Sequence, residues 1–373
     1  MPSETLKKEI LELSKKLIGF KSVSSNQEAV WEVQEYLRGY ITSKVDCNVK
    51  VFEREGVRSY YFSHEGEGKN ICLSGHLDVV PASDDEFLPR SDEDYIYGRG
   101  AGDMKSAVAT MAVAFINNPN SNLSLLITGD EEIGSDNGAG YVNTLIKPDV
   151  LVVTEFSNNK LVLTEKGGLW LDIHITGPGG HASRPWKAVN CVDAMIDLLS
   201  LIREEYPKIT EQEWTNTLNI GSFIGGEVVG GGLGSPNKIA QKASCRLDFR
   251  LVEGTDPGFV FDRVKALASE FEGKLGEGFE ISLSVHKRID LMHTDKEDPN
   301  VEAFLNSMER CGLEKKIVKT AGGSDGRFFS VLGVPVLIFG PSSIGHHSTD
   351  EKVKLETVYK TYDVLEDFVR NNS

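Results

Sequence analysis

Residues 70–78 have the sequence NICLSGHLD, in which a short apolar run leads directly into a histidine and an aspartate. The run at 71–74 is typical of a buried strand, and the apolar runs at 123–128 and 150–154 predict two more strands. Between the first two strands, residues 106–116 are rich in alanine, methionine and valine and predict a helix. This alternation indicates an α/β domain with a mostly parallel central sheet.

The pattern changes after residue 167. Residues 169–176 alternate apolar and polar side chains, which is typical of a half-exposed strand. The segments that follow predict a helix at 188–202, strands at 218–223 and 240–251, a helix at 257–271 and a strand at 279–286. The resulting order βαββαβ indicates a small α+β unit of ferredoxin-like type.

The α/β pattern resumes after residue 287. It predicts a helix at 301–311, a strand at 316–320, a helix after Ser324, a strand at 335–339 and a helix at 355–369. The simplest organisation is a discontinuous α/β domain, residues 1–167 and 288–373, with an α+β domain inserted at 168–287. A chain of 373 residues is long enough for two such domains.

Charge and composition narrow the classes of function. The net charge of −16 disfavours nucleic acid and anionic membranes as partners. No apolar run approaches the roughly 20 residues of a membrane span, and the first twenty residues predict an amphipathic helix rather than a signal peptide. The five cysteines are odd in number and form no CxxC pair, so we expect a reducing, cytoplasmic location.

Five polar segments with metal-binding side chains follow or flank the predicted strands. They are SGHLD at 74–78, GAGDMK at 100–105, GDEEIG at 129–134, TEF at 154–156 and HHSTDE at 346–351. Because the carboxyl ends of parallel strands form the ligand crevice of an open α/β sheet, these loops can converge. Zinc accepts imidazole and carboxylate ligands, and two ions about 3.5–4 Å apart need a bridging carboxylate.

The residue types also allow roles beyond metal binding. Asp78 can fix the tautomer of His76, and one of the adjacent Glu131 and Glu132 can bind metal while the other stays a free base. Each segment alone has a simpler explanation, since an HxD pair is commonly a surface turn and an acidic run a solvated loop. Five such segments in one order at strand ends are much harder to explain in that way.

These segments, in the longer form SGHLDVVP, YGRGAGDMKSAVA, TGDEEIG, VVTEFS and HHSTDE, resemble the M20 metallopeptidase family in its own order. The resemblance implies a metal-dependent amidohydrolase with a zinc-peptidase-like catalytic domain. It also implies that the inserted domain acts as a lid and forms a homodimer. The expected cofactors are two divalent metal ions, zinc in the first place, with cobalt as a possible substitute.

The same resemblance assigns the ligands. One ion would be held by His76, Asp103 and Glu155, and the other by Asp103, Glu132 and His347. Asp103 would bridge the two ions and Glu131 would be the general base. His347 fits its role better than His346, because Asp350 and Glu351 follow it at the family spacing. The chain departs from the family at Phe156, where proline is usual.

The inserted domain supplies further candidates. GPGGHAS at 177–183 resembles a family turn whose histidine, here His181, reaches the active site of the partner subunit and supports the oxyanion. Asn237 and Arg250 match substrate-binding positions of related enzymes. The simpler alternatives are an ordinary turn residue for His181 and a salt bridge at the end of a strand for Arg250.

GGSDGRF at 322–328 resembles a segment that is prominent in desuccinylases and acetylornithine deacetylases. We expect Gly323 and Ser324 to help bind a substrate carboxylate. The favoured substrate is therefore an N-acyl amino acid, with N-succinyl-diaminopimelate first and N-acetylornithine next. A dipeptidase or carboxypeptidase, acting on a short peptide, remains an alternative.

Three other classes of function fit the sequence less well. The GGSDG segment satisfies the nucleophile-elbow pattern of serine hydrolases, but the only acid between Ser324 and His346 is the adjacent Asp325, and the metal-binding segments would be unexplained. A metal-binding homologue without catalytic activity is disfavoured, because Glu131 and every ligand are retained. No G-x-G-x-x-G or Walker A sequence indicates a nucleotide.

Overall fold

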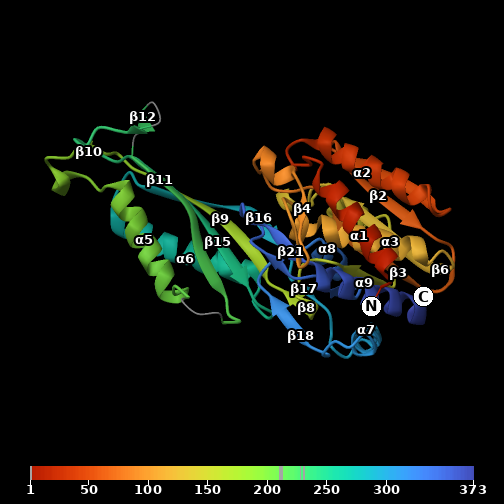
Figure 1. Ribbon diagram of the computed structural model, residues 1–373. Coiled ribbons are helices and arrows are strands. Elements are labelled where there is room, and N and C mark those ends of the chain that lie inside the picture. The colour runs from red at the N-terminus through yellow and green to blue at the C-terminus, as the bar shows by residue number, and fades with distance from the viewer. Residues whose placement is uncertain (1, 210–212, 227, 230–231) are drawn as a thin grey trace. The chain divides into compact units, whose positions relative to one another are not determined.

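The computed structural model of the protein describes residues 2–209, 213–226, 228–229 and 232–373. The chain divides into two compact units, which we call unit 1 (Met1–Glu165 and Met292–Ser373) and unit 2 (Lys166–Leu291). The second boundary lies beyond the expected residue 287, because the last strand of unit 2, β16 (Glu280–Ile289), continues to Ile289. In Figure 1 the red N-terminal and blue C-terminal parts of the chain contribute to one sheet, which belongs to unit 1.

The central sheet of unit 1 has parallel strands in its middle. These are β6 (Ser121–Thr128), β3 (Glu67–His76), β7 (Val150–Val153) and β19 (Val336–Ile338), in this order. Antiparallel strands extend both edges, with β2 (Val57–Ser63) and β1 (Asn48–Arg54) on one side and β8 (Leu161–Glu165) and β17 (Met292–His293) on the other. β18 (Ile317–Thr320) runs parallel to β8. The predicted mostly parallel central sheet is confirmed.

Helices cover both faces of this sheet, which explains why its strands are apolar without alternation. Ile71 and Leu73 of β3 join the core formed with α1 (Glu4–Ile18), α2 (Gln27–Thr42), α3 (Ser106–Asn117), α7 (Pro299–Arg310) and α9 (Leu355–Asn372). Cys72, which points to the opposite face, joins a smaller core with α4 (Ala139–Val142) and α8 (Gly326–Ser330). α3 is buried from Ser106 to Phe115, since its small side chains allow close packing.

Unit 2 has the predicted βαββαβ order. Its elements are β9 (Gly167–Thr176), α5 (Cys191–Glu205), β11 (Thr217–Gly225), β15 (Lys242–Leu251), α6 (Pro257–Leu275) and β16. The strands form an antiparallel sheet in the order β11-β15-β9-β16, and one apolar core joins them to α5 and α6. This is a ferredoxin-like arrangement. Within the described residues, no helix of either unit has the length and apolar character needed to cross a membrane.

Candidate metal centre

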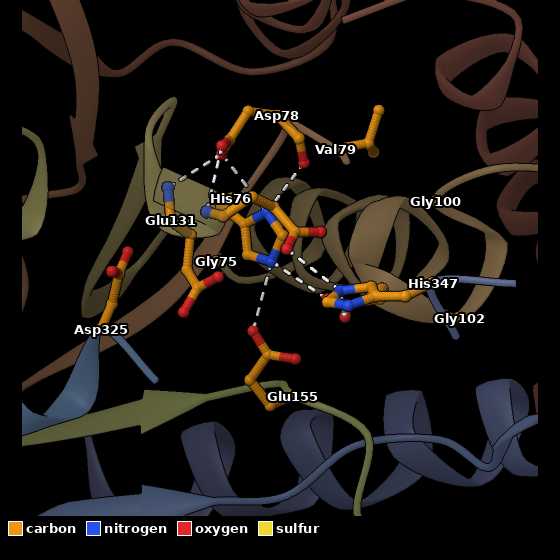
Figure 2. A network of polar contacts seen from close by, with 12 residues as sticks. Gly75, His76, Asp78, Val79, Gly100, Gly102, Glu131, Glu155, Asp325 and His347 are labelled. Atoms are coloured by element: carbon orange, nitrogen blue, oxygen red, sulfur yellow. Dashed lines mark hydrogen bonds and ion pairs between the residues drawn. The ribbon is translucent and has the colours of Figure 1, made fainter. Parts of the chain in front are cut away.

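The predicted ligands come from loops of unit 1, and Figure 2 labels His76, Glu155 and His347 among them. His76 is the last residue of β3, and Glu155 follows β7 by two residues. Asp103 lies in the turn Ala101–Lys105 that precedes α3. His347 lies between β20 (Ser343–Ile344) and β21 (Lys352–Lys354). The carboxyl ends of the parallel strands thus position the first ligands, as expected for an open α/β sheet.

The side chains form two groups that share Asp103. Nε2 of His76 lies 3.2 Å from Oδ1 of Asp103 and 3.3 Å from Oε1 of Glu155. Nε2 of His347 lies 3.4 Å from Oδ2 of Asp103 and 3.0 Å from Oε2 of Glu132. Within each group the possible ligand atoms lie within 4.8 Å of one another. Asp103 therefore offers one oxygen to each group.

The chemistry of these donors fits two divalent cations. Burial opposes the ionisation of Asp103, but hydrogen bonds from His347 and His76 outweigh it and hold the pKa of this carboxyl below its ordinary value. Burial, together with the negative charge of Asp103, raises the pKa of both Glu132 and Glu155. The three carboxylates repel one another, and bound divalent cations would neutralise this negative charge more completely than protons can. Carboxylate and imidazole are also the donors that such cations prefer.

Asp78 supports two of these loops at once. Its buried carboxylate accepts hydrogen bonds from the Ser24 hydroxyl (2.7 Å) and from the backbone N–H groups of Glu131 (3.1 Å) and Glu132 (3.2 Å). Nδ1 of His76 lies closer to the backbone oxygen of Asp78 (2.9 Å) than to its carboxylate (3.4 Å). The backbone of Asp78 therefore orients the imidazole, while its carboxylate fixes the turn that carries Glu131 and Glu132 (Figure 2).

Glu351 was missed as a site residue, although it closes the HHSTDE segment. Its carboxylate accepts hydrogen bonds from the backbone N–H groups of Gly100 (3.1 Å), Gly102 (3.0 Å) and Asp103 (3.1 Å), and from the Arg99 guanidinium (2.7 Å). These bonds set the turn that presents the shared Asp103. The sequence does show an acidic residue shortly after His347 in the HHSTDE segment. Its hydrogen-bond partner Asp103, however, lies 248 residues earlier in the chain, and this pairing cannot be read from the segment itself.

Ser324 has a different place from the one expected. It is fully buried, and both its hydroxyl (2.8 Å) and its N–H group (3.0 Å) donate to Oε2 of Glu165. The Arg327 guanidinium donates to the carbonyl of Ser324 (2.8 Å). Both donors of Ser324 are thus committed inside the protein, whereas Gly323 is exposed. Contacts of Gly323 and Ser324 with a substrate carboxylate stay predictions.

The predicted residues of unit 2 lie at its surface. His181, in β10 (Gly180–His181), is exposed, and its Nδ1 accepts a hydrogen bond from the N–H group of Ser183 (3.1 Å). The N–H group of Ala182 donates to the carbonyl of Asn237 (2.9 Å), so His181 and Asn237 are neighbours. Arg250 pairs with Asp248 (3.0 Å), which is the simpler alternative considered for it. Their action at the metal centre stays a prediction.

Comparisons with known proteins agree with this architecture. Residues 72–371 match the peptidase family M20/M25/M40. The succinyl-diaminopimelate desuccinylase of Nautilia profundicola is 27% identical over 379 residues, which cover 96% of this chain and 98% of its own length. That of a Sulfurovum species is 27% identical over 380 residues, with coverage of 97% and 98%.

Solved structures show the same fold. A tripeptidase from Staphylococcus aureus superposes with a TM-score of 0.79 at 20% identity, and a dinuclear metal-binding M20 peptidase from Bacillus subtilis with 0.70 at 12%; each comparison covers 98% of both chains. The fold and the paired ligand groups define a metal-dependent hydrolase. The chain belongs to the peptidase family M20/M25/M40.

The substitution Glu351→Gln tests the support of the Asp103 turn. We expect it to lower the free energy of unfolding of the metal-free protein by about 2 kcal/mol, because one charged acceptor oxygen is lost and the Arg99 guanidinium keeps, among the described residues, only Glu86 as an ionised partner. Urea unfolding measures the change. The neighbouring Asp350→Asn, at an exposed side chain, is the control and should stay within about 0.5 kcal/mol of the parent. Equal effects of the two substitutions would contradict the assignment.

The Glu165 carboxyl should make stability depend on pH. Burial raises its pKa to about 8, although the hydrogen bonds from Ser324 lower the pKa in part. The folded protein then keeps a proton that the unfolded chain releases above its ordinary pKa of 4.5, so stability falls as pH rises from about 5 to 8. This one proton gives a slope of about 1.4 kcal/mol per pH unit.

Glu165→Gln should remove that contribution from the pH profile. The measurement is the difference in free energy of unfolding between parent and variant, by urea unfolding at several pH values between 5 and 8. Ser324→Ala is the control, because it removes the hydroxyl but keeps the acid and therefore the slope. Parallel profiles for the parent and Glu165→Gln would show that Glu165 is ionised throughout.

Proposed function

We propose that the protein is a two-zinc amidohydrolase that cleaves the amide bond of an N-acyl amino acid, with N-succinyl-diaminopimelate as the first candidate substrate. The observation that carries the proposal is the pair of ligand groups joined by Asp103, with Glu131 beside them. The choice of substrate is supported by the desuccinylases that are 27% identical over nearly the whole chain.

Each metal ion would have its own ligands besides the shared one. His76 and Glu155 would complete one site, and Glu132 and His347 the other. The mixture of imidazole and carboxylate favours zinc, and cobalt accepts the same donors. When bound, the two ions would polarise the substrate carbonyl and lower the pKa of water toward neutrality.

Glu131 is the group that would move protons. It lies beside His76 and Glu155 in Figure 2 but belongs to neither ligand group, so its carboxylate stays available. Its backbone is held by Asp78. Burial raises the pKa of the Glu131 carboxyl well above its ordinary value, which makes its carboxylate a stronger proton acceptor. Glu131 would take the proton from the attacking water and return it to the nitrogen of the leaving amine.

Unit 2 would complete the active site. His181 would donate to the oxyanion in the partner subunit of a homodimer formed through unit 2. Asn237 and Arg250 would bind the substrate, and closure of unit 2 would exclude water. The exposure of His181 and its bonded neighbour Asn237 support this proposal. The free thiols of all five cysteines support a cytoplasmic location.

N-acetylornithine is the second candidate substrate, and a short peptide is the further alternative. The metal centre and Glu131 act on the amide itself and do not select the acyl group. The similarity of the fold to a tripeptidase is compatible with this alternative. The partners of the protein would therefore be small amide substrates in each case.

Removal of the base tests the mechanism. Glu131→Ala should lower kcat by about 10²- to 10⁴-fold, which is the usual contribution of a general base, and leave the bound metal unchanged. Glu132→Ala is the matched comparison, since it should reduce both turnover and metal content. Turnover within tenfold of the parent for Glu131→Ala, at equal metal content, would show that another group is the base.

Metal reconstitution tests the function as a whole. The protein is stripped with a chelator, titrated with zinc and assayed for amine release from N-succinyl-diaminopimelate, N-acetylornithine, other N-acyl amino acids and dipeptides. We expect two equivalents of zinc and hydrolysis of the succinylated substrate first. Two bound equivalents of zinc without cleavage of any substrate would support the alternative that the protein binds metal but has no catalytic activity. Failure to bind zinc would refute the ligand assignment.

A further inference from the structure

An aromatic contact joins the residues next to two metal ligands. Phe156, which stands where the family usually has proline, follows Glu155 directly, and His346 precedes His347. The rings of Phe156 and His346 are stacked, with centroids 4.5 Å apart and an interplanar angle of 29°. The contact therefore links a ligand loop of the first group with a ligand loop of the second.

The two loops differ in how firmly they are held. The loop after Glu155 is fixed by hydrogen bonds to residues 340 and 341. The Ser157 hydroxyl accepts a hydrogen bond from the N–H group of Gly340 (2.9 Å), and the N–H group of Ser157 donates to the carbonyl of Pro341 (3.2 Å). A Cβ atom at Gly340 would lie 2.4 Å from the backbone oxygen of Glu155, so these segments touch closely. This side of the stack is a firm support.

The loop of His346 and His347 lies at the end of a short hairpin and is exposed. His347 has a φ of +61°, a conformation that a residue with a side chain adopts only at some cost. Within the loop, the N–H group and the hydroxyl of Ser348 donate to the carbonyl of Gly345 (2.9 and 2.7 Å). These bonds close the turn on itself, and the carbonyl of Ser348 also accepts a hydrogen bond from the Arg99 guanidinium (3.1 Å). None of these bonds ties the turn to the Glu155 loop.

We propose that the Phe156–His346 stack is a positioning contact that holds His347 in place for the second metal ion. The inference rests on the metal ligands of the proposed function and adds two residues that bind no metal. His346 belongs to neither ligand group within the described residues, and its ring is 5.9 Å from that of His347. It acts through the face of its ring against Phe156, and the stack offsets the cost of the His347 conformation.

The test compares variants that break the stack with variants that keep it. Phe156→Ala and His346→Ala should each weaken binding of the second zinc equivalent by roughly three- to tenfold, which corresponds to the usual worth of an aromatic pair, and leave the first equivalent unchanged. Phe156→Tyr and His346→Phe retain stacked rings and should bind both equivalents as the parent does. Competition with a chromophoric chelator gives the affinities, and the absorption of bound cobalt reports the geometry of the second site.

A matched control breaks a similar stack elsewhere. His286→Ala removes the ring that stacks on Trp170 in unit 2, at 5.9 Å, and should leave the affinities of both equivalents unchanged. Turnover of Phe156→Ala should return to within about twofold of the parent at saturating zinc, since the stack contacts no reacting group in the proposed mechanism. Thermal unfolding of each variant identifies any that fail to fold. If an alanine variant does not fold, His346→Phe still tests the inference, because it keeps the stacked rings and removes the imidazole.

Three outcomes would overturn the inference. Parent-like affinity of Phe156→Ala for the second equivalent would show that the stack does not position His347. Loss of the second equivalent in His346→Phe would show that His346 is itself a ligand. Binding of fewer than two equivalents of zinc by the parent protein would refute the metal ligands of the proposed function. That result comes from the parent, whereas the first two outcomes come from variants, so the two failures can be told apart.

Discussion

The rest of the site depends on the carboxylate of Asp103. It faces His76 with one oxygen and His347 with the other, so the two ligand groups cannot move independently. Burying this charge is costly unless its partners are fixed. The hydrogen bonds from both histidines keep the pKa of Asp103 low despite its burial, and the carboxylate is therefore ionised and ready to bridge.

Two further carboxylates fix the loops before any ligand binds. Glu351 accepts backbone N–H groups from the Asp103 turn, and Asp78 accepts those of Glu131 and Glu132. Hydrogen bonds from N–H groups to a charged acceptor are stronger than those between neutral groups. Because the donors are backbone groups, the fold itself positions the turns that carry Asp103, Glu131 and Glu132. The site is preorganised at the expense of several buried charges.

The parts that the sequence predicted are those with a local signal. The strands β3, β6 and β7 are continuous apolar runs, and the ligands follow them in short segments with a recognisable order. The hairpin of β1 and β2 was not predicted, because β1 is largely exposed and has no clear apolar pattern. The roles of Ser324 and Glu351 depend on partners 159 and 248 residues away, Glu165 and Asp103, and such pairings cannot be read from a single sequence.

The proposed function assigns the chemistry to unit 1. Every proposed metal ligand, the base Glu131 and the supports Asp78 and Glu351 lie in unit 1. In that proposal these groups act on an amide and on the water that attacks it, and neither depends on the acyl group. Ser324, the one buried candidate for substrate binding in unit 1, already donates to Glu165. In the proposed function, selectivity for the acyl group would then come from exposed positions such as Gly323 and from the predicted residues of unit 2.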